Sequence, residues 1–191
     1  MSTSSSSLVI APSVSQYNIP LADLLSQNGN KRLVVGVAVI VPAAIAHADS
    51  AGASTTHKTQ NKLLVVQRAV AEESFAGMYE LPGGHADAID GDQTLLDAVV
   101  RETREETGLE VVEIVGEFKG FEYVAGRSGE TTRQFNFVVK VRLGGEGEGL
   151  AVRLNPEEHQ KYAWVREEKD LEELSLTGSM EDVVKDALRY L

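Results

Sequence analysis

The apolar residues of the chain recur with the period of β-strands in several segments. Residues 33–41 form a nearly unbroken run rich in valine, which is typical of a strand buried on both faces of a sheet. Residues 77–81 lead directly into Pro82-Gly83-Gly84, which cannot continue a strand ladder and therefore predicts a sharp turn. Further strands are predicted at residues 62–68, 109–124, 134–143 and 162–165.

A helix is predicted after this turn, at residues 95–107. Thr94 is a typical N-cap with Asp97 three positions later, and Gly108 is a typical left-handed residue after a helix. Apolar or small residues recur at helical spacing and are expected to face the core: Leu96, Val99, Val100, Thr103 and Thr107. Shorter helices are predicted at residues 20–27, 168–174 and 179–191.

Other stretches show no periodic pattern. Residues 1–16 are rich in serine and predict a mobile tail, whereas residues 43–61 mix small and polar residues and predict a long loop. Residues 144–149 alternate glycine with glutamate and predict another loop. We therefore expect a tail with a short helix at residues 1–30 and one folded domain at residues 31–191.

Composition and charge narrow the classes of function. The 191 residues are 42% hydrophobic and 25% charged, which is ample for the core of a water-soluble protein. A net charge of -11 repels nucleic-acid polymers and anionic membranes, so we expect a small-molecule partner instead. The absence of cysteine excludes disulfides and thiolate chemistry. No signal-peptide or transmembrane pattern is present, and we expect a cytoplasmic location.

The predicted helix carries three glutamates that oppose its local stability. Glu102, Glu105 and Glu106 stand at i, i+3 and i+4, so their like charges share one helical surface. They also lie in the last turns, where anions oppose the negative end of the helix dipole. One interpretation is a solvated surface on which Arg101 pairs with Glu105. The other is a site where Mg²⁺ or Mn²⁺ relieves the repulsion, because these cations prefer carboxylate oxygens.

The glycine turn and this helix together resemble a known motif. Leu81-Pro82-Gly83-Gly84 and Arg101-Glu102-Thr103-Arg104-Glu105-Glu106-Thr107-Gly108-Leu109 resemble the box of the Nudix hydrolase family, G-x5-E-x7-R-E-U-x-E-E-x-G-U, where U is a bulky apolar residue. Gly84 and Arg101 are seventeen positions apart where this pattern has fourteen, which indicates a three-residue insertion. Asp90 or Asp92 is expected to replace the first glutamate of the box.

The resemblance implies both a fold and an activity. The fold would be of the α/β class, an α/β/α sandwich around a mixed β-sheet. The activity would be metal-dependent hydrolysis of a pyrophosphate bond, by attack of water at phosphorus, in a nucleoside diphosphate linked to another moiety. Substrates of this kind are nucleotide sugars, dinucleotides and nucleoside triphosphates, including oxidised ones. Homodimers are common in the family, so a homodimer is one expected assembly.

The resemblance also assigns residues to a metal site. The carbonyl of Gly83 and the carboxylates of Glu102, Glu105 and Glu106 would bind Mg²⁺ or Mn²⁺. Arg101 would orient these carboxylates.

Two regions of the chain offer candidates for the general base. It would be a glutamate of the box, Glu102 or Glu105, or a carboxylate of a later loop, where Glu157 and Glu158 stand. An equally good interpretation of the latter pair is a solvated Pro-Glu-Glu turn.

Four residues on neighbouring predicted strands are candidates for contact with a base or a phosphate: Phe121, Tyr123, Arg133 and Gln134. Aromatic and polar residues also alternate on any half-buried strand, so a purely structural role explains them too. The missing first glutamate favours one further alternative, a Nudix-fold module that binds nucleotides with weak or no turnover.

Overall fold

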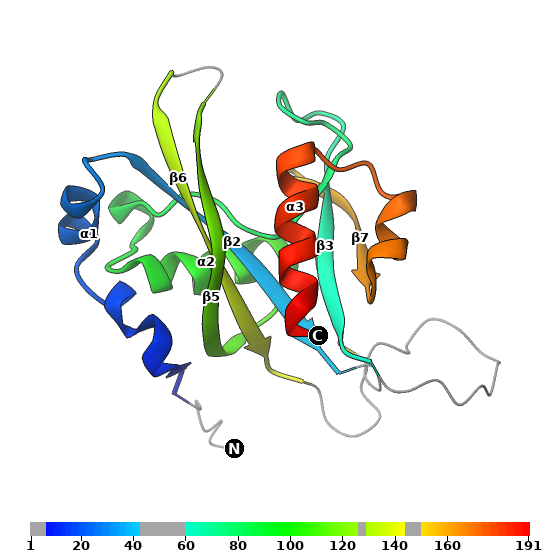
Figure 1. Ribbon diagram of the computed structural model, residues 1–191, viewed down its shortest axis with the longest axis horizontal. Coiled ribbons are helices and arrows are strands. Elements are labelled where there is room, and N and C mark those ends of the chain that lie inside the picture. The colour runs from blue at the N-terminus through cyan, green and yellow to red at the C-terminus, as the bar shows by residue number, and fades with distance from the viewer. Residues whose placement is uncertain (1–6, 43–59, 126–128, 144–149) are drawn as a thin grey trace.

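A mixed β-sheet forms the centre of the computed structural model, which describes residues 7–42, 60–125, 129–143 and 150–191 (Figure 1). The strand order in this part of the chain is β1-β5-β6-β2-β3-β4, and β7 pairs with β3 outside this order. The strands are β1 (Val9–Ile10), β2 (Arg32–Val41), β3 (Lys62–Arg68), β4 (Tyr79–Glu80), β5 (Val111–Val124), β6 (Thr131–Val141) and β7 (His159–Val165).

Strand β2 joins two parts of the sheet. It pairs in parallel with β6 from Arg32 to Val39, but its antiparallel pairing with β3 is limited to Ile40 and Val41. Strands β2 and β3 therefore diverge over most of the length of β2. This divergence exposes a strand edge to which another segment of the chain can bind.

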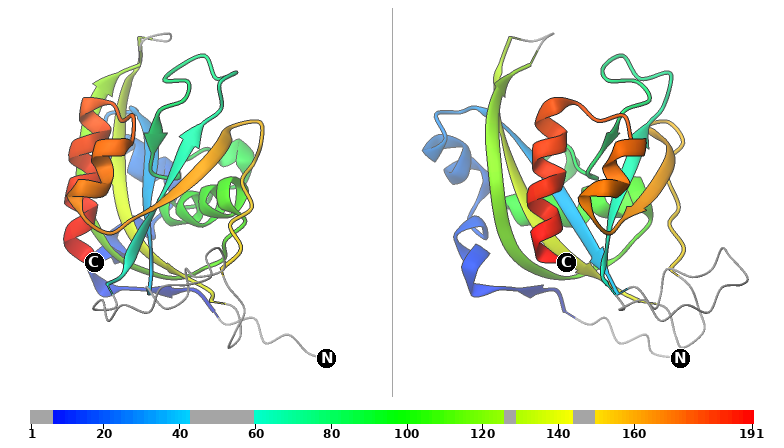
Figure 2. Two further views of the ribbon diagram at one scale, coloured as in Figure 1. Left: turned by 90° about the vertical axis from the view of Figure 1, so that its right-hand side faces the viewer. Right: turned by 45° about the vertical axis from the view of Figure 1, so that its right-hand side comes forward.

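Helices lie on both faces of the sheet, as the two views in Figure 2 show. Helix α2 (Leu95–Thr107) packs on one face and α3 (Gly178–Ala187) on the other (Figures 1 and 2). The predicted α/β class and α/β/α sandwich are thereby confirmed. The remaining helices are α1 (Leu21–Gln27) and the 3-10 helices η1 (Pro12–Tyr17), η3 (Ala88–Asp90), η4 (Glu168–Glu173) and η5 (Leu188–Tyr190).

The hydrophobic core consists of two clusters, one on each face of the sheet. The valines of β2, such as Val37 and Val39, pack in one cluster with Leu96 of α2. Ala38 belongs to the other cluster, with Val184 of α3. Because successive strand residues point to opposite faces, β2 contributes to both clusters, as its apolar run predicts.

The sequence signals for helix α2 are confirmed in detail. Thr94 and Asp97 form a reciprocal capping box, and Gly108 ends the helix with a φ of 69°. Thr103 is fully buried, and its hydroxyl donates to the carbonyl of Val99 at 2.7 Å. The predicted inward face of the helix is therefore correct at Thr103, whose hydroxyl finds a partner within the helix itself.

The N-terminal region differs from the prediction. Val9–Ile10 pair in parallel with β5 at Glu113 and Ile114, and Val14 is fully buried against the core. The prediction of a mobile tail is therefore wrong from residue 9 onward, while residues 1–6 lie outside the described residues. A strand of two residues forms only because it pairs with a neighbouring strand. The serine-rich local sequence therefore could not predict it.

Other predicted elements differ only at their ends. The final helix ends at Ala187 and continues as a 3-10 turn, and the predicted short helix near residue 168 is a 3-10 helix. Most of the predicted 43–61 loop, and all of the 144–149 loop, lie outside the described residues. Within the described ranges, every helix is too short or too polar to cross a membrane.

Candidate metal centre

The Pro82-Gly83-Gly84 turn occupies the free edge of β2. The backbone N–H of Val37 donates to the Pro82 carbonyl at 2.7 Å, and that of Val35 donates to the Gly84 carbonyl at 2.9 Å. Gly83 has a φ of 151°, and a Cβ there would lie 2.0 Å from the Val35 carbonyl oxygen. Only glycine fits this position, which explains why the turn has this sequence.

Helix α2 places two carboxylates directly against this turn. Glu106 is buried, and its Oε2 accepts a hydrogen bond of 2.8 Å from the backbone N–H of Gly83. Glu102, one turn earlier, is also buried, and a Cβ on Gly84 would lie 2.5 Å from its Oε1. The two glycines thus permit the close approach that brings both carboxylates to the edge of the sheet.

Arg101 is held by a buried aspartate. Its Nε and Nη2 donate to the two carboxylate oxygens of Asp92 at 3.0 and 2.8 Å, and Nη2 also donates to the His85 carbonyl. Its Nη1 lies 3.0 Å from Glu102 and 2.9 Å from Glu105. The guanidinium therefore connects Asp92 to the carboxylates of α2, which is an orienting position.

The start of β7 forms the opposite wall of the site. One carboxylate oxygen of Glu106, one of Glu158 and one ring nitrogen of His159 lie within 4.8 Å of one another. His159 is buried, and its Nε2 lies 3.3 Å from Oε1 of Glu80. Glu80 accepts a second hydrogen bond, of 2.8 Å, from Arg68 on β3.

The electrostatics of the site favour a cation. Burial raises the pKa of Glu102 to about 7, against the lowering effect of Arg101 beside it. Burial raises the pKa of Glu106 well above its usual range, although the Gly83 amide partly offsets this, and the like charges of Glu102, Glu80 and Glu158 raise it further.

These residues fit a divalent cation on chemical grounds. Glu102, Glu106 and Glu158, which we call the carboxylate cluster, supply hard oxygen donors, and the neighbouring turn is free of side chains at its glycines. Nδ1 of His159 is buried without a hydrogen-bond partner among the described residues. A cation would neutralise the cluster and remove the cost of burying its charges.

The structure brings together some of the predicted site residues and not others. Gly83, Glu102, Glu106 and Glu158 converge, with Arg101 beside them. The side chain of Glu105 is 55% exposed and pairs with Arg101, which matches the ion-pair interpretation of this residue.

Glu157 lies apart from this group. It is exposed, and its backbone N–H donates to the Asn155 side chain at 3.2 Å. Its geometry is that of the solvated turn that the sequence equally allows.

Three of the four predicted substrate contacts line one pocket of about 410 Å³. Phe121, Tyr123 and Gln134 lie in it, and the Phe121 and Tyr123 rings are 5.6 Å apart. Arg68 and Glu80 also line this aromatic pocket, which connects it to the carboxylate cluster. Its other lining residues include Phe75, Met78, Tyr79 and Met180.

Arg133 does not join this pocket. Its guanidinium donates to the Asn28 side chain at 2.8 Å and lies 4.7 Å from the centre of the Phe135 ring. Because neighbouring strand residues point in opposite directions, Arg133 and Gln134 cannot both face the same side of β6.

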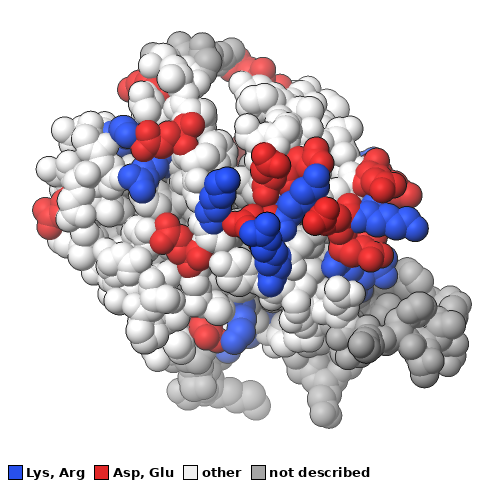
Figure 3. Space-filling view, in the orientation of Figure 1, with Lys and Arg blue, Asp and Glu red and all other residues white. Residues whose placement is uncertain are grey.

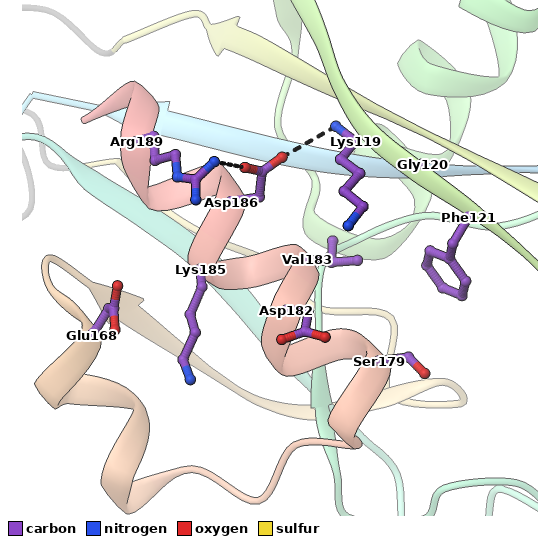
Figure 4. A pocket seen from close by; sticks show the side chains of 10 residues that line it. All are labelled: Lys119, Gly120, Phe121, Glu168, Ser179, Asp182, Val183, Lys185, Asp186 and Arg189. Carbon is purple, nitrogen blue, oxygen red and sulfur yellow. Dashed lines mark hydrogen bonds and ion pairs between the residues drawn. The ribbon is translucent and has the colours of Figure 1, made fainter.

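A second pocket, of about 500 Å³, lies between β5 and α3 (Figure 4). Two of its charged side chains form a pair, because Asp186 accepts from Arg189 at 2.7 Å, and Asp186 also accepts from the Lys119 backbone N–H at 3.2 Å. Among the predicted site residues only Phe121 lines it. This pocket therefore stands apart from the carboxylate cluster.

Surface charge agrees with a small-molecule site. On the face shown in Figure 3, basic side chains are interspersed with acidic ones and form no separate basic patch. This face offers no continuous basic strip to which a phosphate backbone could bind, in line with the net charge of -11.

Sequence reasoning missed three residues of the site: Arg68, Glu80 and His159. Glu80 lies just before the glycine turn, and His159 directly follows the predicted Glu158. Their nearness in sequence to predicted site residues could have identified both. Arg68 had no such signal, because its link to Glu80 follows only from the pairing of β3 with β4.

Comparisons with known proteins identify the family of this chain. The family model described as NUDIX domain matches residues 46–186, well over half of the chain. No curated protein matches the chain. Among solved structures, the NUDIX domain of Shewanella oneidensis NrtR complexed with ADP ribose is similar, with a TM-score of 0.59 and 18% identity over 84% of this chain and 88% of that one.

Two further solved structures share the fold. A MutT NUDIX hydrolase from Burkholderia pseudomallei has a TM-score of 0.54 and 20% identity, covering 81% of this chain and 96% of that one. A C. elegans Ap4A hydrolase in a binary complex has a TM-score of 0.53 and 17% identity, covering 83% and 93%. The chain therefore belongs to the NUDIX domain family.

Proposed function

We propose that this protein hydrolyses a pyrophosphate bond in a nucleoside diphosphate linked to another moiety and that it requires Mg²⁺ or Mn²⁺. The observation that carries the proposal is the convergence of Glu102, Glu106 and Glu158 on the glycine turn. The buried carboxylates of Glu102 and Glu106 and the exposed carboxylate of Glu158 beside them repel one another without a cation, so the arrangement serves an ion that binds there.

We assign the cation to Glu106 and Glu158, with the Gly83 carbonyl and Glu105 as the further ligands expected from the Nudix box. When bound, it would supply positive charge that neutralises the phosphate oxygens and activates water. Glu105 pairs with Arg101 at the rim, so it would reach the ion only after this pair rearranges.

Glu102 is the general base in this proposal. It lies beside Glu106 and Glu158, and its pKa of about 7 matches the range in which a carboxylate accepts protons from water near neutral pH. Arg101 orients it through the 3.0 Å contact to Oε1. Glu157, which is exposed and whose backbone N–H donates to the Asn155 side chain, is assigned no part in the reaction.

We infer that Asp92 takes the place of the first glutamate of the box. Asp92 binds Arg101 through both oxygens, whereas Asp90 is exposed at the end of η3. Two of the three extra residues then precede Asp92, in the segment that contains η3 and Gly91, and the third lies between Asp92 and Arg101. A loop tolerates such an insertion at low entropic cost.

The aromatic pocket suits the nucleoside part of the substrate. Phe121 and Tyr123 offer ring surfaces, and Gln134 offers a side-chain amide at the same pocket. Stacking of a base on aromatic rings contributes roughly 1–3 kcal/mol per base. Two of the similar structures are a NUDIX domain complexed with ADP ribose and an Ap4A hydrolase, which makes ADP-ribose and diadenosine polyphosphates the first substrates to test.

A substrate panel tests the proposal. It should contain ADP-ribose, diadenosine polyphosphates, nucleotide sugars, and ordinary and oxidised nucleoside triphosphates, each with Mg²⁺, Mn²⁺ or EDTA. We expect hydrolysis to a nucleoside monophosphate or diphosphate with metal and none with EDTA. Turnover that persists in EDTA would contradict the metal requirement. Tight nucleotide binding without any hydrolysis would instead support the binding-module alternative. The homodimer and the cytoplasmic location remain predictions from the sequence and the family.

A further inference from the structure

His159 is an unusual residue for a site built from carboxylates. It is the first residue of β7 and is only 2% exposed, directly after Glu158. One of its ring nitrogens lies within 4.8 Å of carboxylate oxygens of both Glu106 and Glu158. The imidazole therefore faces the same space as the carboxylate cluster.

The hydrogen bonds of the ring determine its tautomer. Nε2 lies 3.3 Å from Oε1 of Glu80, and a carboxylate in a pair with Arg68 is an acceptor, so Nε2 carries the proton. Nδ1 is then unprotonated and holds a lone pair. It is buried and has no hydrogen-bond partner among the described residues.

A purely structural role explains only half of this arrangement. The bond to Glu80 would anchor the ring, but a buried acceptor without a partner is destabilising. A cation beside two carboxylates satisfies this lone pair and neutralises the carboxylates together.

We propose that Nδ1 of His159 is a ligand of a divalent cation bound between Glu106 and Glu158, with Glu80 as the carboxylate that orients the imidazole. This inference rests on the proposed function of the same site. Ligand atoms about 2.1 Å from one ion lie within about 4.2 Å of one another, which is close to the 4.8 Å within which the ligand atoms of Glu106, Glu158 and His159 lie. A histidine ligand commonly donates its second ring nitrogen to a carboxylate, as His159 does to Glu80.

A nitrogen ligand changes which cation the site prefers. Mg²⁺ favours oxygen ligands alone, whereas imidazole suits first-row transition cations. The site therefore prefers ions such as Mn²⁺ over Mg²⁺. This preference is stronger than that of a site with the same carboxylates and no imidazole.

Pulsed electron paramagnetic resonance of the full-length protein loaded with Mn²⁺ tests the ligand directly. We expect nitrogen modulation from a coordinated imidazole in the wild type, and a changed pattern when the histidines are labelled with ¹⁵N. His159→Gln retains a side-chain donor for Glu80 but removes the imidazole, so the modulation should disappear. His85→Gln is the matched control and should retain it, because Nδ1 of His85 accepts from Arg32 and His85 is not part of the group of possible ligands that Glu106, Glu158 and His159 form.

Binding of the metal alone gives a second readout. Titration calorimetry should show that His159→Gln weakens Mn²⁺ binding by about 10- to 100-fold, the loss typical when a partner of a metal site is removed. The preference for Mn²⁺ over Mg²⁺ should narrow in the same variant. A thermal melt of each variant checks that the fold is retained.

The outcomes separate this inference from the proposed function. Wild-type protein that binds Mn²⁺ without nitrogen modulation overturns the inference, even if hydrolysis requires metal. Modulation that persists in His159→Gln overturns it as well. Nitrogen modulation in a protein that hydrolyses no substrate supports the inference and contradicts the proposed function. If the wild type binds no Mn²⁺ at all, both fail. Should His159→Gln not fold, the wild-type spectrum with ¹⁵N-labelled histidine still decides the question.

Discussion

At the scale of single residues, the three glutamates of α2 are not equivalent. Glu102 and Glu106 stand one helical turn apart and are buried against the glycine turn, whereas Glu105 points outward and pairs with Arg101. The sequence pattern treats all three alike as metal ligands. Their different burial predicts that Glu102 and Glu106 matter more for activity than Glu105, and substitutions can test this order.

Glu106→Gln should lower kcat by at least about 100-fold, because even outer partners of metal sites contribute 10- to 100-fold. Glu105→Gln should lower kcat less, since its side chain is 55% exposed and bound to Arg101. Steady-state kinetics at saturating metal measures both. Equal losses in the two variants would show that Glu105 moves into the site during turnover.

Asp92→Asn should destabilise the protein by about 1–3 kcal/mol, because it removes the buried carboxylate that accepts two hydrogen bonds from Arg101, while Glu102 and Glu105 still pair with the guanidinium. Asp90→Asn is the matched control and should change the free energy of unfolding by less than about 0.5 kcal/mol, because Asp90 is exposed. Urea denaturation compares the two variants. A larger loss in Asp90→Asn would reject Asp92 as the replacement for the box glutamate.

At the scale of elements, helix α2 is defined at both ends by local chemistry. The capping box of Thr94 and Asp97 satisfies backbone N–H groups at its start, and Gly108 adopts the left-handed conformation that ends it. These signals act within a few residues of one another, so the bounds of this helix could be predicted from the sequence. Strand β1 shows the opposite case, because its two residues become a strand only through β5.

Thr94→Ala should destabilise the protein by about 1 kcal/mol, the usual cost of losing an N-cap hydrogen bond. The metal site lies at the other end of the helix, so kcat should stay within about twofold of the wild-type value under conditions where both are folded. Urea denaturation and a kinetic assay on the same samples measure the two effects. A large loss of kcat with unchanged stability would mean that the start of the helix acts on the site directly.

At the scale of the whole molecule, the fold concentrates negative charge at one edge of its sheet. The raised pKa values of Glu102 and Glu106 mean that the folded, metal-free protein binds protons more tightly there than the unfolded chain does. This contribution to stability is present at low pH and is lost as the pH rises through the folded-state pKa. For Glu102 the window runs from its ordinary value of 4.5 to about 7.

The stability advantage of the wild type over Glu102→Gln should therefore shrink as the pH rises from about 5 to 8 in EDTA. Saturating Mn²⁺ should reduce this pH dependence, because the cation stabilises the ionised carboxylates. Denaturation of both proteins across this range, with and without metal, measures the difference. A difference that does not vary with pH in EDTA would contradict the raised pKa of Glu102.

The sequence by itself determined the box residues, the bounds of α2 and the buried character of β2. These features depend on contacts within a few positions and on the periods of helix and strand. Tertiary structure alone decided which carboxylates of different elements meet. The separation of two such residues along the chain carries no information on the distance between their side chains. Glu80, Glu106 and His159 come together only because the glycine turn fills the gap between β2 and β3, and because β7 pairs with β3 in a register that sets His159 opposite Arg68.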